Sequence, residues 1–282
     1  MPVTRPRRAK RATKAPEAPS GGGGGGHSKK QPALIPPVQD NVAIIIPALN
    51  EESSLLDVIS EIPRTYPTRV VVIDNGSSDG TADVARRAGA EVVSQPRRGY
   101  GRACLAGFAH LAATPPDVVV VLDADHSDYP EDLGALLAPI LAGDADLVCG
   151  SRIELAEAGA LAPQVRYGNT LATFLIRVFH GFAYADMGPF RAIRWEALGR
   201  LEMCDPTYGW NAEMQVKALQ RGLRVVEVPV RYRRRVGRSK ISGTVKGTVL
   251  AGGLIIWTII ALKVFPAWQE RRREHGSIEP VP

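Results

Sequence analysis

The chain has 282 residues, 45% of them hydrophobic and 23% charged, which is enough apolar material for one large domain or for a domain with an appendage. Its three cysteines, Cys104, Cys149 and Cys204, are an odd number and lack the spacing of metal ligands. They argue against a disulfide framework and for a reducing compartment. The formal net charge of +6 comes from one end of the chain.

The positive charge is concentrated in the first 33 residues. They hold eight Arg or Lys residues against one Glu, a net charge of +7, so the rest of the chain sums to −1. Residues 1–40 contain a run of six glycines with scattered Pro and Ala, and they are too poor in apolar residues to fold. We predict a disordered basic arm without the apolar stretch of a signal peptide. Attraction to anionic lipid and a merely solvated tail are both open as its role.

Apolar runs and helical patterns alternate from residue 42 onward. Short apolar runs predict strands over residues 42–46, 69–74, 90–94, 118–122 and 146–150. Apolar spacing predicts helices over residues 51–62 and 79–89 and another from about Gly101. Strands and helices that take turns are typical of an α/β fold with a doubly wound, mostly parallel sheet.

The strand over residues 118–122 ends in acidic residues, in the sequence VVVVLDADHSD. Such an apolar strand belongs inside a parallel sheet, and the carboxyl ends of these strands are where open α/β sheets bind ligands. Residues two apart in an extended chain project to the same side, so Asp123 and Asp125 can converge on a divalent cation. Asp128 could instead cap a helix starting near Pro130. A phosphohydrolase, in which the first Asp is a nucleophile, is a rival interpretation.

Polar turns follow the first two predicted strands. The first strand runs into PALNEE, with Pro47 and Asn50 in the turn and Glu51 in the first helical turn. The second runs into DNGSSDGT, where Asp74 ends the strand in the same layer as the acidic pair. Acidic residues at two strand ends indicate a nucleotide above them, held by hydrogen bonds and by a phosphate-bound cation. Residues 79–80 are explained equally well as a helix cap.

Four stretches in this order, IIIPALNEE, VIDNGSSDGT, RRGYG and LDADHSD, resemble the nucleotide-sugar half of family 2 glycosyltransferases with the GT-A fold. Further on, four more stretches resemble the polyprenyl-phosphate branch, similar to dolichyl-phosphate mannose synthase: GSR at 150–152, Arg166 to Asn169, DMGPFRAIR at 186–194 and YRRRVGRSK at 232–240. The resemblance covers roughly residues 41–246. It weakens the phosphohydrolase interpretation, because that nucleophile usually follows the first strand, whereas Asp123 follows the fourth.

The resemblance implies roles for individual residues. Positions that contact the nucleoside match Pro47, Asn50, Glu51 and Asp74, with Asp74 facing the base. Carboxylates that hold Mg²⁺ or Mn²⁺ against the donor diphosphate match Asp123 and Asp125. Basic positions that face phosphates match Arg152 and Arg166, and the late loop that closes over donor and acceptor matches Arg234, Ser239 and Lys240.

The sequence also departs from the family pattern. His126 and Ser127 stand where the family usually has Leu and Gln, which leaves a third side-chain ligand for the cation open. Tyr100 stands where a phosphate-facing Lys is frequent, and DMGPFR is one residue shorter than the usual form. The acceptor pocket is therefore expected to differ from that of typical relatives.

The reaction implied by the resemblance sets chemical requirements. Cleavage of the bond between sugar and diphosphate develops negative charge on the leaving group, which a divalent cation and nearby Arg side chains stabilise. The acceptor attacks the opposite face and inverts the anomeric carbon. A phosphate acceptor is already ionised, whereas a hydroxyl acceptor needs a base. Glu213, in YGWNAEMQ, is the candidate base, and a supporting or surface position on a helix is its alternative.

The last part of the sequence indicates a membrane surface. RYRRRVGRSK holds six Arg or Lys in ten residues, which repel one another unless an anion compensates them, and its single aromatic, Tyr232, argues against nucleic acid. Residues 247–262 are uncharged but shorter than the roughly 20 apolar residues of a spanning helix. They suit an interfacial or half-inserted helix, with Trp257, Lys246 and Lys263 as anchors. A helix packed on the body is the alternative.

We therefore predict an inverting, metal-dependent glycosyltransferase that moves a sugar from a nucleotide sugar to a polyprenyl phosphate at the cytoplasmic face of a membrane. A family 2 glycosyltransferase with a hydroxyl acceptor and a catalytically silent binding subunit for nucleotide sugar or lipid phosphate are the alternatives. The expected parts are a basic arm (1–40), a GT-A domain (41–246), a membrane-associated helix (247–265) and a polar tail (266–282). The predicted catalytic residues are Asp123, Asp125, Arg152 and Glu213.

Overall fold

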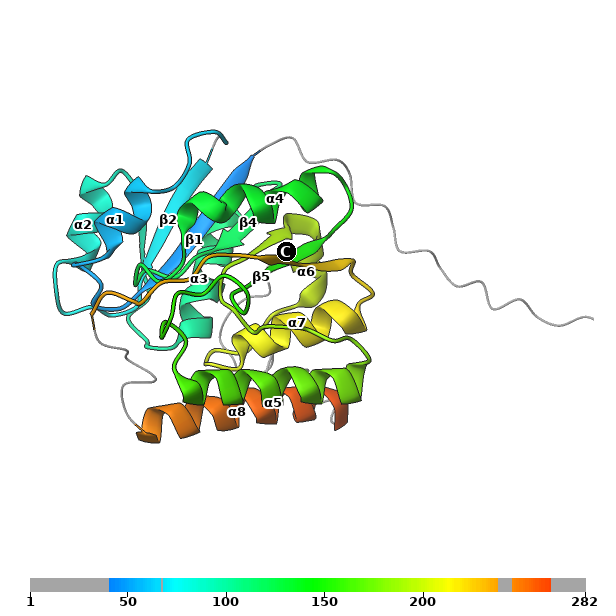
Figure 1. The fold of residues 1–282 in the computed structure, drawn as a ribbon. Coiled ribbons are helices and arrows are strands. Elements are labelled where there is room, and N and C mark those ends of the chain that lie inside the picture. The colour runs from blue at the N-terminus through cyan, green and yellow to red at the C-terminus, as the bar shows by residue number, and fades with distance from the viewer. Residues whose placement is uncertain (1–40, 67, 238–244, 265–282) are drawn as a thin grey trace, which may run out of the picture. The chain divides into compact units, whose positions relative to one another are not determined.

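The structure is a computed structural model and describes residues 41–66, 68–237 and 245–264. The predicted arm and tail lie outside these residues. Seven strands form one sheet in the order β3-β2-β1-β4-β6-β5-β7 (Figure 1). In chain order they are β1 (Val42–Ala48), β2 (Thr68–Asp74), β3 (Glu91–Ser94), β4 (Val118–Val121), β5 (Leu147–Ser151), β6 (Arg191–Arg194) and β7 (Val225–Pro229).

Eight α-helices and one short 3₁₀ helix connect and cover these strands in the described residues. They are α1 (Leu55–Ser60), α2 (Thr81–Arg87), α3 (Tyr100–Leu111), η1 (Pro130–Asp132), α4 (Leu133–Leu141), α5 (Pro163–His180), α6 (Trp195–Leu201), α7 (Trp210–Gln220) and α8 (Val245–Val264).

The sheet is mixed rather than wholly parallel. Strand β1 pairs in parallel with β2 and β4, and β2 with β3. Strand β6 lies between β4 and β5 and is antiparallel to both, while β5 and β7 are parallel. The five predicted strands are present, but β6 and β7 were not predicted. Strand β6 reads RAIR, and its two arginines are almost fully buried, so hydropathy alone does not mark it as an interior strand.

Each buried arginine of β6 is satisfied by backbone carbonyls. Arg191 donates to the carbonyls of Pro189, Gly188 and Asn211. Arg194 donates to the carbonyls of Ala145 and Ile140. Such bonds make burial of a charged side chain tolerable, because an unpartnered buried charge is very costly.

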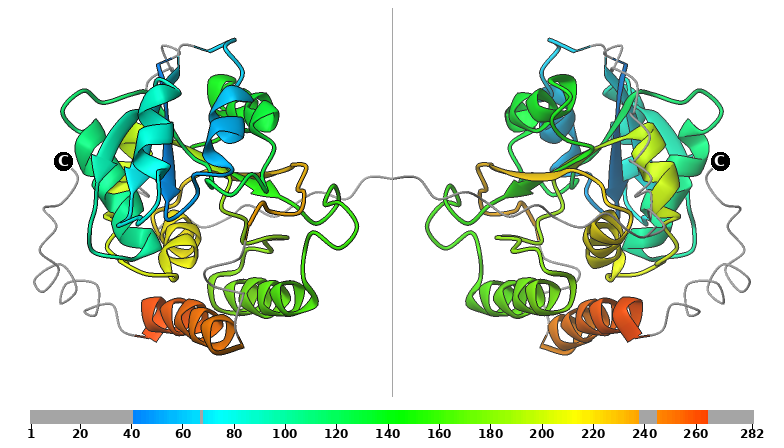
Figure 2. Two further views of the ribbon diagram at one scale, coloured as in Figure 1. Left: turned by 90° about the vertical axis from the view of Figure 1, so that its left-hand side faces the viewer. Right: turned by 90° about the vertical axis from the view of Figure 1, so that its right-hand side faces the viewer.

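Apolar side chains on the two faces of the sheet form two separate cores. On one face, alternate residues of β1, β2 and β4 pack against α3, α6 and α7, with contributions from α5 and α8. On the other face, the intervening residues pack against α1, α2 and α4. The helices lie on both sides of the strands, as expected for a doubly wound sheet (Figures 1 and 2).

Two predicted helix starts differ in the structure. Helix α1 begins at Leu55 rather than near residue 51, because Asn50 adopts a left-handed φ of 53° and the chain turns before the helix begins. The interpretation of Asp128 as a helix cap is wrong. The 3₁₀ helix η1 follows Tyr129, and no side chain caps it.

Helices α5 and α8 lie side by side, and α8 also packs against α7 (Figures 1 and 2). Gln220 donates to the Leu262 carbonyl (3.0 Å), and the Thr258 hydroxyl donates to Asp205 (3.3 Å). One face of α8 is thus packed on the body, as the alternative interpretation of this segment expects. In the described part of the chain, no helix has the length and apolar character needed to cross a membrane.

Candidate active site

The turns after β1 and β2 interlock. The Ser78 N–H donates to Asn50 Oδ1 (2.7 Å), and the Asn50 N–H donates to Ser77 Oγ (3.0 Å). The Glu51 N–H donates to Thr81 Oγ1 (2.8 Å) at the start of α2. These residues come from neighbouring parallel strands, so the carboxyl edge of the sheet is organised before any ligand binds.

Two of the other predicted nucleoside contacts lie at the same edge. Pro47 and Asp74 are at the ends of the paired strands β1 and β2. Asp74 accepts a hydrogen bond from the Ser77 N–H (3.0 Å), which shapes the turn after β2. The structure therefore brings the four predicted positions together at adjacent strand ends.

Asn75, which the sequence analysis did not single out, organises the next loop. Its buried side-chain amide donates to the carbonyls of Gln95 and Arg97, both at 2.9 Å, and accepts from the Gly99 N–H (2.8 Å). Three bonds from one side chain fix residues 95–99 at the start of α3. The signal in the sequence is weak, since Asn is common in turns for local reasons.

Tyr100, the first residue of α3, reaches the end of β4. Its hydroxyl donates to Asp123 Oδ1 (3.1 Å). Burial and then the negative charge of Asp125 raise the pKa of Asp123 to about 7, although the Tyr100 hydrogen bond acts in the opposite direction. The two carboxylates therefore lie close enough to repel each other.

Asp125 and Asp128 complete an acidic cluster in the loop after β4. Asp125 Oδ1 accepts hydrogen bonds from the Ser127 N–H and hydroxyl. Asp128 is 1% exposed, and neither of its carboxylate oxygens has a hydrogen-bond partner among the described residues. Burial, followed by the charges of Asp123 and Asp125, raises the pKa of Asp128 well above its ordinary value. Within the described ranges, no three His, Cys, Asp or Glu side chains are grouped so as to hold a metal ion.

Arg152 lies next to this cluster in a buried ion pair. Its Nε is 2.7 Å from Asp186 Oδ2, and its Nη2 is 2.9 Å from Asp186 Oδ1. The guanidinium also lies 4.9 Å from the centre of the Tyr232 ring. Burial opposes the charged form of Asp186, but the Arg152 guanidinium outweighs it and lowers the pKa of Asp186. Arg152 is therefore held firmly in position beside Asp128.

The other predicted basic residues are dispersed. Arg166 is exposed in the first turns of α5, and Arg234 reaches the Ala158 carbonyl at the long distance of 3.4 Å. Ser239 and Lys240 lie outside the described residues. Arg235, which was not predicted, is instead the arginine that contacts the cluster, with Nη2 3.1 Å from Asp125 Oδ2.

Glu213 is buried on α7 and does not face solvent. Its carboxylate pairs with Lys217 Nζ (2.8 Å), and the two side chains are 2% and 1% exposed. It also accepts hydrogen bonds from the backbone N–H groups of Cys204 (3.1 Å) and Asp205 (2.7 Å). This position suits the anchoring of the loop at residues 204–205, the supporting role weighed above, rather than proton exchange with a substrate.

Fold and site define an α/β protein that binds a ligand at the carboxyl ends of its parallel strands, beside an acidic loop. The family model described as "Glycosyl transferase family 2" matches residues 43–199. The chain belongs to this family and is a glycosyltransferase.

Relatives with known names support the predicted branch. An uncharacterized glycosyltransferase of Mycobacterium tuberculosis is 43% identical over 79% of this chain and 99% of that protein. A polyprenol monophosphomannose synthase of Mycolicibacterium smegmatis is 33% identical over 76% of this chain and 86% of its own length. An undecaprenyl-phosphate mannosyltransferase of Micrococcus luteus is 32% identical, with coverages of 73% and 89%. The resemblance to the polyprenyl-phosphate branch is thereby confirmed.

Solved structures share the fold. Glucosyl-3-phosphoglycerate synthase from Mycobacterium tuberculosis, crystallised with Mn²⁺, UDP and glucosyl-3-phosphoglycerate, matches with a TM-score of 0.65 and 24% identity over 80% of both chains. The same synthase was also crystallised with Mg²⁺ and UDP. The predicted GT-A fold is confirmed, with β6 as the antiparallel strand that the sequence did not indicate.

Proposed function

We propose that this chain is an inverting, cation-dependent glycosyltransferase that moves a hexosyl group from a nucleotide sugar to a polyprenyl phosphate at a membrane surface. The acidic cluster of Asp123, Asp125 and Asp128 beside the interlocked turns is the observation that carries the proposal. The names of the relatives from Mycolicibacterium smegmatis and Micrococcus luteus support the lipid-phosphate acceptor.

The residues at the end of β4 fit Mg²⁺ or Mn²⁺. Hard cations are commonly held by one or two carboxylates while substrate phosphates and water supply the other ligands, so a complete protein cage is not required. Asp123 and Asp125 are those carboxylates, and the unpartnered oxygens of buried Asp128 add negative charge beside them. A bound cation there would stabilise the charge that develops on the leaving diphosphate.

The chain's own residues account for the other requirements. Asn50, Glu51 and Asp74 are fixed at the strand ends and would orient the nucleoside, and Arg152 provides fixed positive charge beside the reacting phosphates. A phosphate acceptor attacks with an oxygen that is already ionised, so the sugar's bond to diphosphate breaks without a base on the protein. The burial of Glu213 in an ion pair favours this acceptor over a hydroxyl.

The surface of α5 and α8 supports membrane association. On α5, Tyr167, Phe174 and Val178 are between 58% and 74% exposed, and on α8 Leu250, Trp257 and Val264 are between 47% and 60% exposed. The spacings of seven and four residues put each set on one face of its helix. Aromatic and aliphatic side chains of this kind lie at headgroup depth in membrane-bound helices.

The charges on these helices favour an anionic bilayer. Neither helix contains Asp or Glu, whereas Arg166, Arg177 and Lys263 are exposed on them. Negative headgroups attract such a surface, and a second copy of the same surface would be repelled. The three cysteines are free, which agrees with a location at the cytoplasmic face.

Product formation tests the enzymatic proposal. The full chain is incubated with each nucleotide sugar, a polyprenyl phosphate and Mg²⁺ or Mn²⁺, and lipid-soluble sugar is measured after extraction. We expect one donor to give a glycolipid, with the product losing its sugar under mild acid as a phosphodiester-linked glycoside does. Transfer only to soluble hydroxyl acceptors, or no transfer with any donor, would contradict the proposal.

Substitution of Glu213 by Gln separates the two kinds of acceptor. With a phosphate acceptor, turnover per folded molecule should change by less than about 3-fold, whereas loss of a general base would reduce it by about 100- to 10,000-fold. The fraction of folded protein is measured separately, because Lys217 loses its buried partner in this variant.

Flotation with vesicles tests the membrane surface. Phe174→Ser combined with Trp257→Ser should release the protein from vesicles of phosphatidylcholine with 30% phosphatidylglycerol, since burial of apolar area contributes about 25 cal/mol per Å². Leu56→Ser, at an equally exposed apolar position on α1, is the matched control and should not change flotation. Undiminished flotation of the double variant at high salt would contradict a docking role for the two helices.

A further inference from the structure

Three alternate arginines in the segment after β7 each pair with carboxylates from a different part of the chain. We call Arg231, Arg233 and Arg235 the arginine ladder. The segment is extended, and backbone bonds from Arg233 N–H to the Ser127 carbonyl and from Val236 N–H to the Asp125 carbonyl, both 2.9 Å, fix it along the loop after β4. Alternate side chains of an extended segment point to the same side, which explains the repeated pairing.

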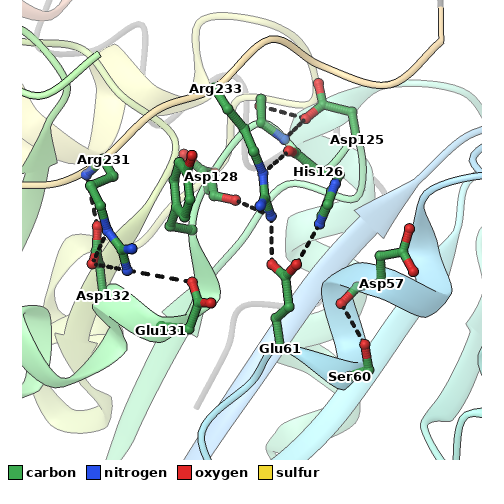
Figure 3. A network of polar contacts seen from close by, with 12 residues as sticks. Asp57, Ser60, Glu61, Asp125, His126, Asp128, Glu131, Asp132, Arg231 and Arg233 are labelled. Atoms are coloured by element: carbon green, nitrogen blue, oxygen red, sulfur yellow. Dashed lines mark hydrogen bonds and ion pairs between the residues drawn. The ribbon is translucent and has the colours of Figure 1, made fainter. Parts of the chain in front are cut away.

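The first two members of the ladder are anchors away from the acidic cluster. Arg231 lies 2.7 Å from Asp132 Oδ1, and Arg233 lies 2.5 Å from Glu61 Oε2 at the end of α1 (Figure 3). Both guanidinium groups stack on the Tyr129 ring, at 4.4 and 4.3 Å from its centre. The repulsion expected within this basic run is therefore largely compensated by the protein itself rather than by an external anion.

The third member ends in the acidic cluster. Arg235 Nη2 lies 3.1 Å from Asp125 Oδ2 and 3.4 Å from Glu51 Oε1. Ser127 already occupies Asp125 Oδ1, so both oxygens of this carboxylate have partners. A cation that binds Asp125 through Oδ2 must therefore compete with the guanidinium. Two positive groups cannot share one carboxylate oxygen at this distance without strong repulsion.

The guanidinium of Arg235 is also incompletely bonded. Its Nε is buried and has no hydrogen-bond partner among the described residues. A buried donor without an acceptor is unfavourable, so an anionic oxygen brought to this position would be bound well. A diphosphate supplies such oxygens in the planar arrangement that a guanidinium matches.

We propose that Arg235 is an exchangeable counter-ion: it neutralises Asp125 in the ligand-free protein, yields that carboxylate to the divalent cation, and then binds an oxygen of the donor diphosphate. The inference rests on the proposed function for the arrival of a cation and a diphosphate at this site. It assigns to Arg235 a role in donor binding, in addition to the neighbouring Arg234 that the family resemblance suggests.

Binding of Mn²⁺ alone tests the first half of the exchange. Mn²⁺ is titrated into the ligand-free full chain and followed by the electron paramagnetic resonance signal of the free ion. Arg235→Ala should bind Mn²⁺ about 10-fold more tightly than the parent, because the competing charged hydrogen bond is gone. Arg235→Lys keeps the charge and should stay within about 3-fold of the parent. Arg231→Ala removes an anchor with no contact to Asp125 and is the matched control, with unchanged affinity.

Binding of pyrophosphate in the presence of saturating Mn²⁺ tests the second half. Arg235→Ala should bind pyrophosphate about 10-fold more weakly by calorimetry, because the guanidinium donors are missing. Arg235→Lys should be weaker as well, since a point charge does not replace the planar donors. Opposite shifts for the two ligands are not expected from misfolding, which would weaken both.

Several outcomes would overturn the inference. Equal or weaker Mn²⁺ binding in Arg235→Ala, or unchanged pyrophosphate binding, would show that Arg235 neither competes nor exchanges. If Arg235→Ala does not fold, a similar Mn²⁺ gain in Arg235→Lys would argue against competition by charge. Asp125→Asn identifies the level of failure: retained Mn²⁺ binding there contradicts the cation site of the proposed function, whereas its loss with an unaltered Arg235→Ala affinity refutes only the counter-ion.

Discussion

The two halves of the sheet differ in how they treat buried polar atoms. In described residues up to Asp123, every buried side-chain nitrogen and oxygen has a hydrogen-bond partner, as the interlocked turns after β1 and β2 illustrate. The seven unpartnered buried atoms of the described chain all come later, in Asp128, His180, Trp210, Asn211, Gln215 and Arg235.

This difference indicates where the protein is complete without ligands. Unpartnered buried polar groups each cost about 1–3 kcal/mol, so native proteins keep few of them. The first half is preorganised for the donor, whereas Asp128 and Arg235 in the second half keep bonding capacity beside the reacting phosphates. Variants on either side of this boundary should therefore fail in different ways.

The largest effect is expected at the boundary itself. Asp125→Asn should reduce transfer by at least about 1,000-fold while the protein stays folded, because an amide is a poor ligand for a hard cation. Excess chelator should do the same to the parent protein. Product formation and a thermal unfolding curve measure the two properties. Substantial activity of the variant or of the chelated protein would contradict the cation assignment.

Loss of a buried charge in the second half should mainly reduce stability. Arg152→Met leaves the Asp186 carboxylate buried without its ion pair, at a cost of about 3–5 kcal/mol in the free energy of unfolding. Urea unfolding measures it. The double variant Arg152→Met with Asp186→Leu should be no less stable than the single one. A single variant within about 1 kcal/mol of the parent would show that the pair is not what fixes this region.

In the first half, Asn75→Ala should cost less. The variant removes three hydrogen bonds, each contributing about 1 kcal/mol, so we expect a loss of about 2–3 kcal/mol and weaker donor binding. The exposed pair of Arg86 with Asp83 provides the control, since Arg86→Ala should change the free energy of unfolding by less than about 0.5 kcal/mol. Unchanged donor affinity in Asn75→Ala would separate the loop at residues 95–99 from the site.

The smallest effect concerns pH and the outer edge of the first half. A hydrogen bond from Arg69 lowers the pKa of Glu91 to about 2 from an ordinary 4.5, with His110 assisting. The ionised form is favoured in the folded state, so this stabilisation is present above pH 4.5 and is lost as pH falls towards 2. Because Glu91 is 43% exposed, it amounts to less than about 1 kcal/mol.

Replacement of Glu91 by Gln tests this pH dependence. The difference in the free energy of unfolding between parent and variant should be measurable at pH 7 and should shrink steadily below pH 4.5. A difference that is constant from pH 7 to pH 3 would mean that the carboxylate charge does not contribute.

The sequence predicted the first half of the fold well because its signals are local. Strands β1, β2 and β4 are continuous apolar runs, and the polar turns follow them directly in the chain. The sequence also indicated that Asp123 and Asp125 converge, since their spacing of two residues alone suffices.

The second half depends on contacts that the sequence does not display. Strand β6 is recognisable only when carbonyls from distant segments satisfy Arg191 and Arg194. The choice of Arg235 rather than Arg234 at the cluster follows from which side of an extended segment faces the loop after β4, and one residue of register decides it. Glu213 looked available because its buried partner Lys217 is visible only in the packed helix.

The late position of β6 in the chain has a consequence for biosynthesis. During translation, β4 can pair with β1 as soon as it is made, but its other edge waits for β6, which follows about 70 residues later. At about 5–20 residues per second this delay lasts roughly 4–14 seconds. Meanwhile the nascent sheet ends in four consecutive valines with unpaired backbone groups, a typical template for aggregation. We expect overproduction at low temperature or with added chaperones to raise the soluble yield by protecting this edge.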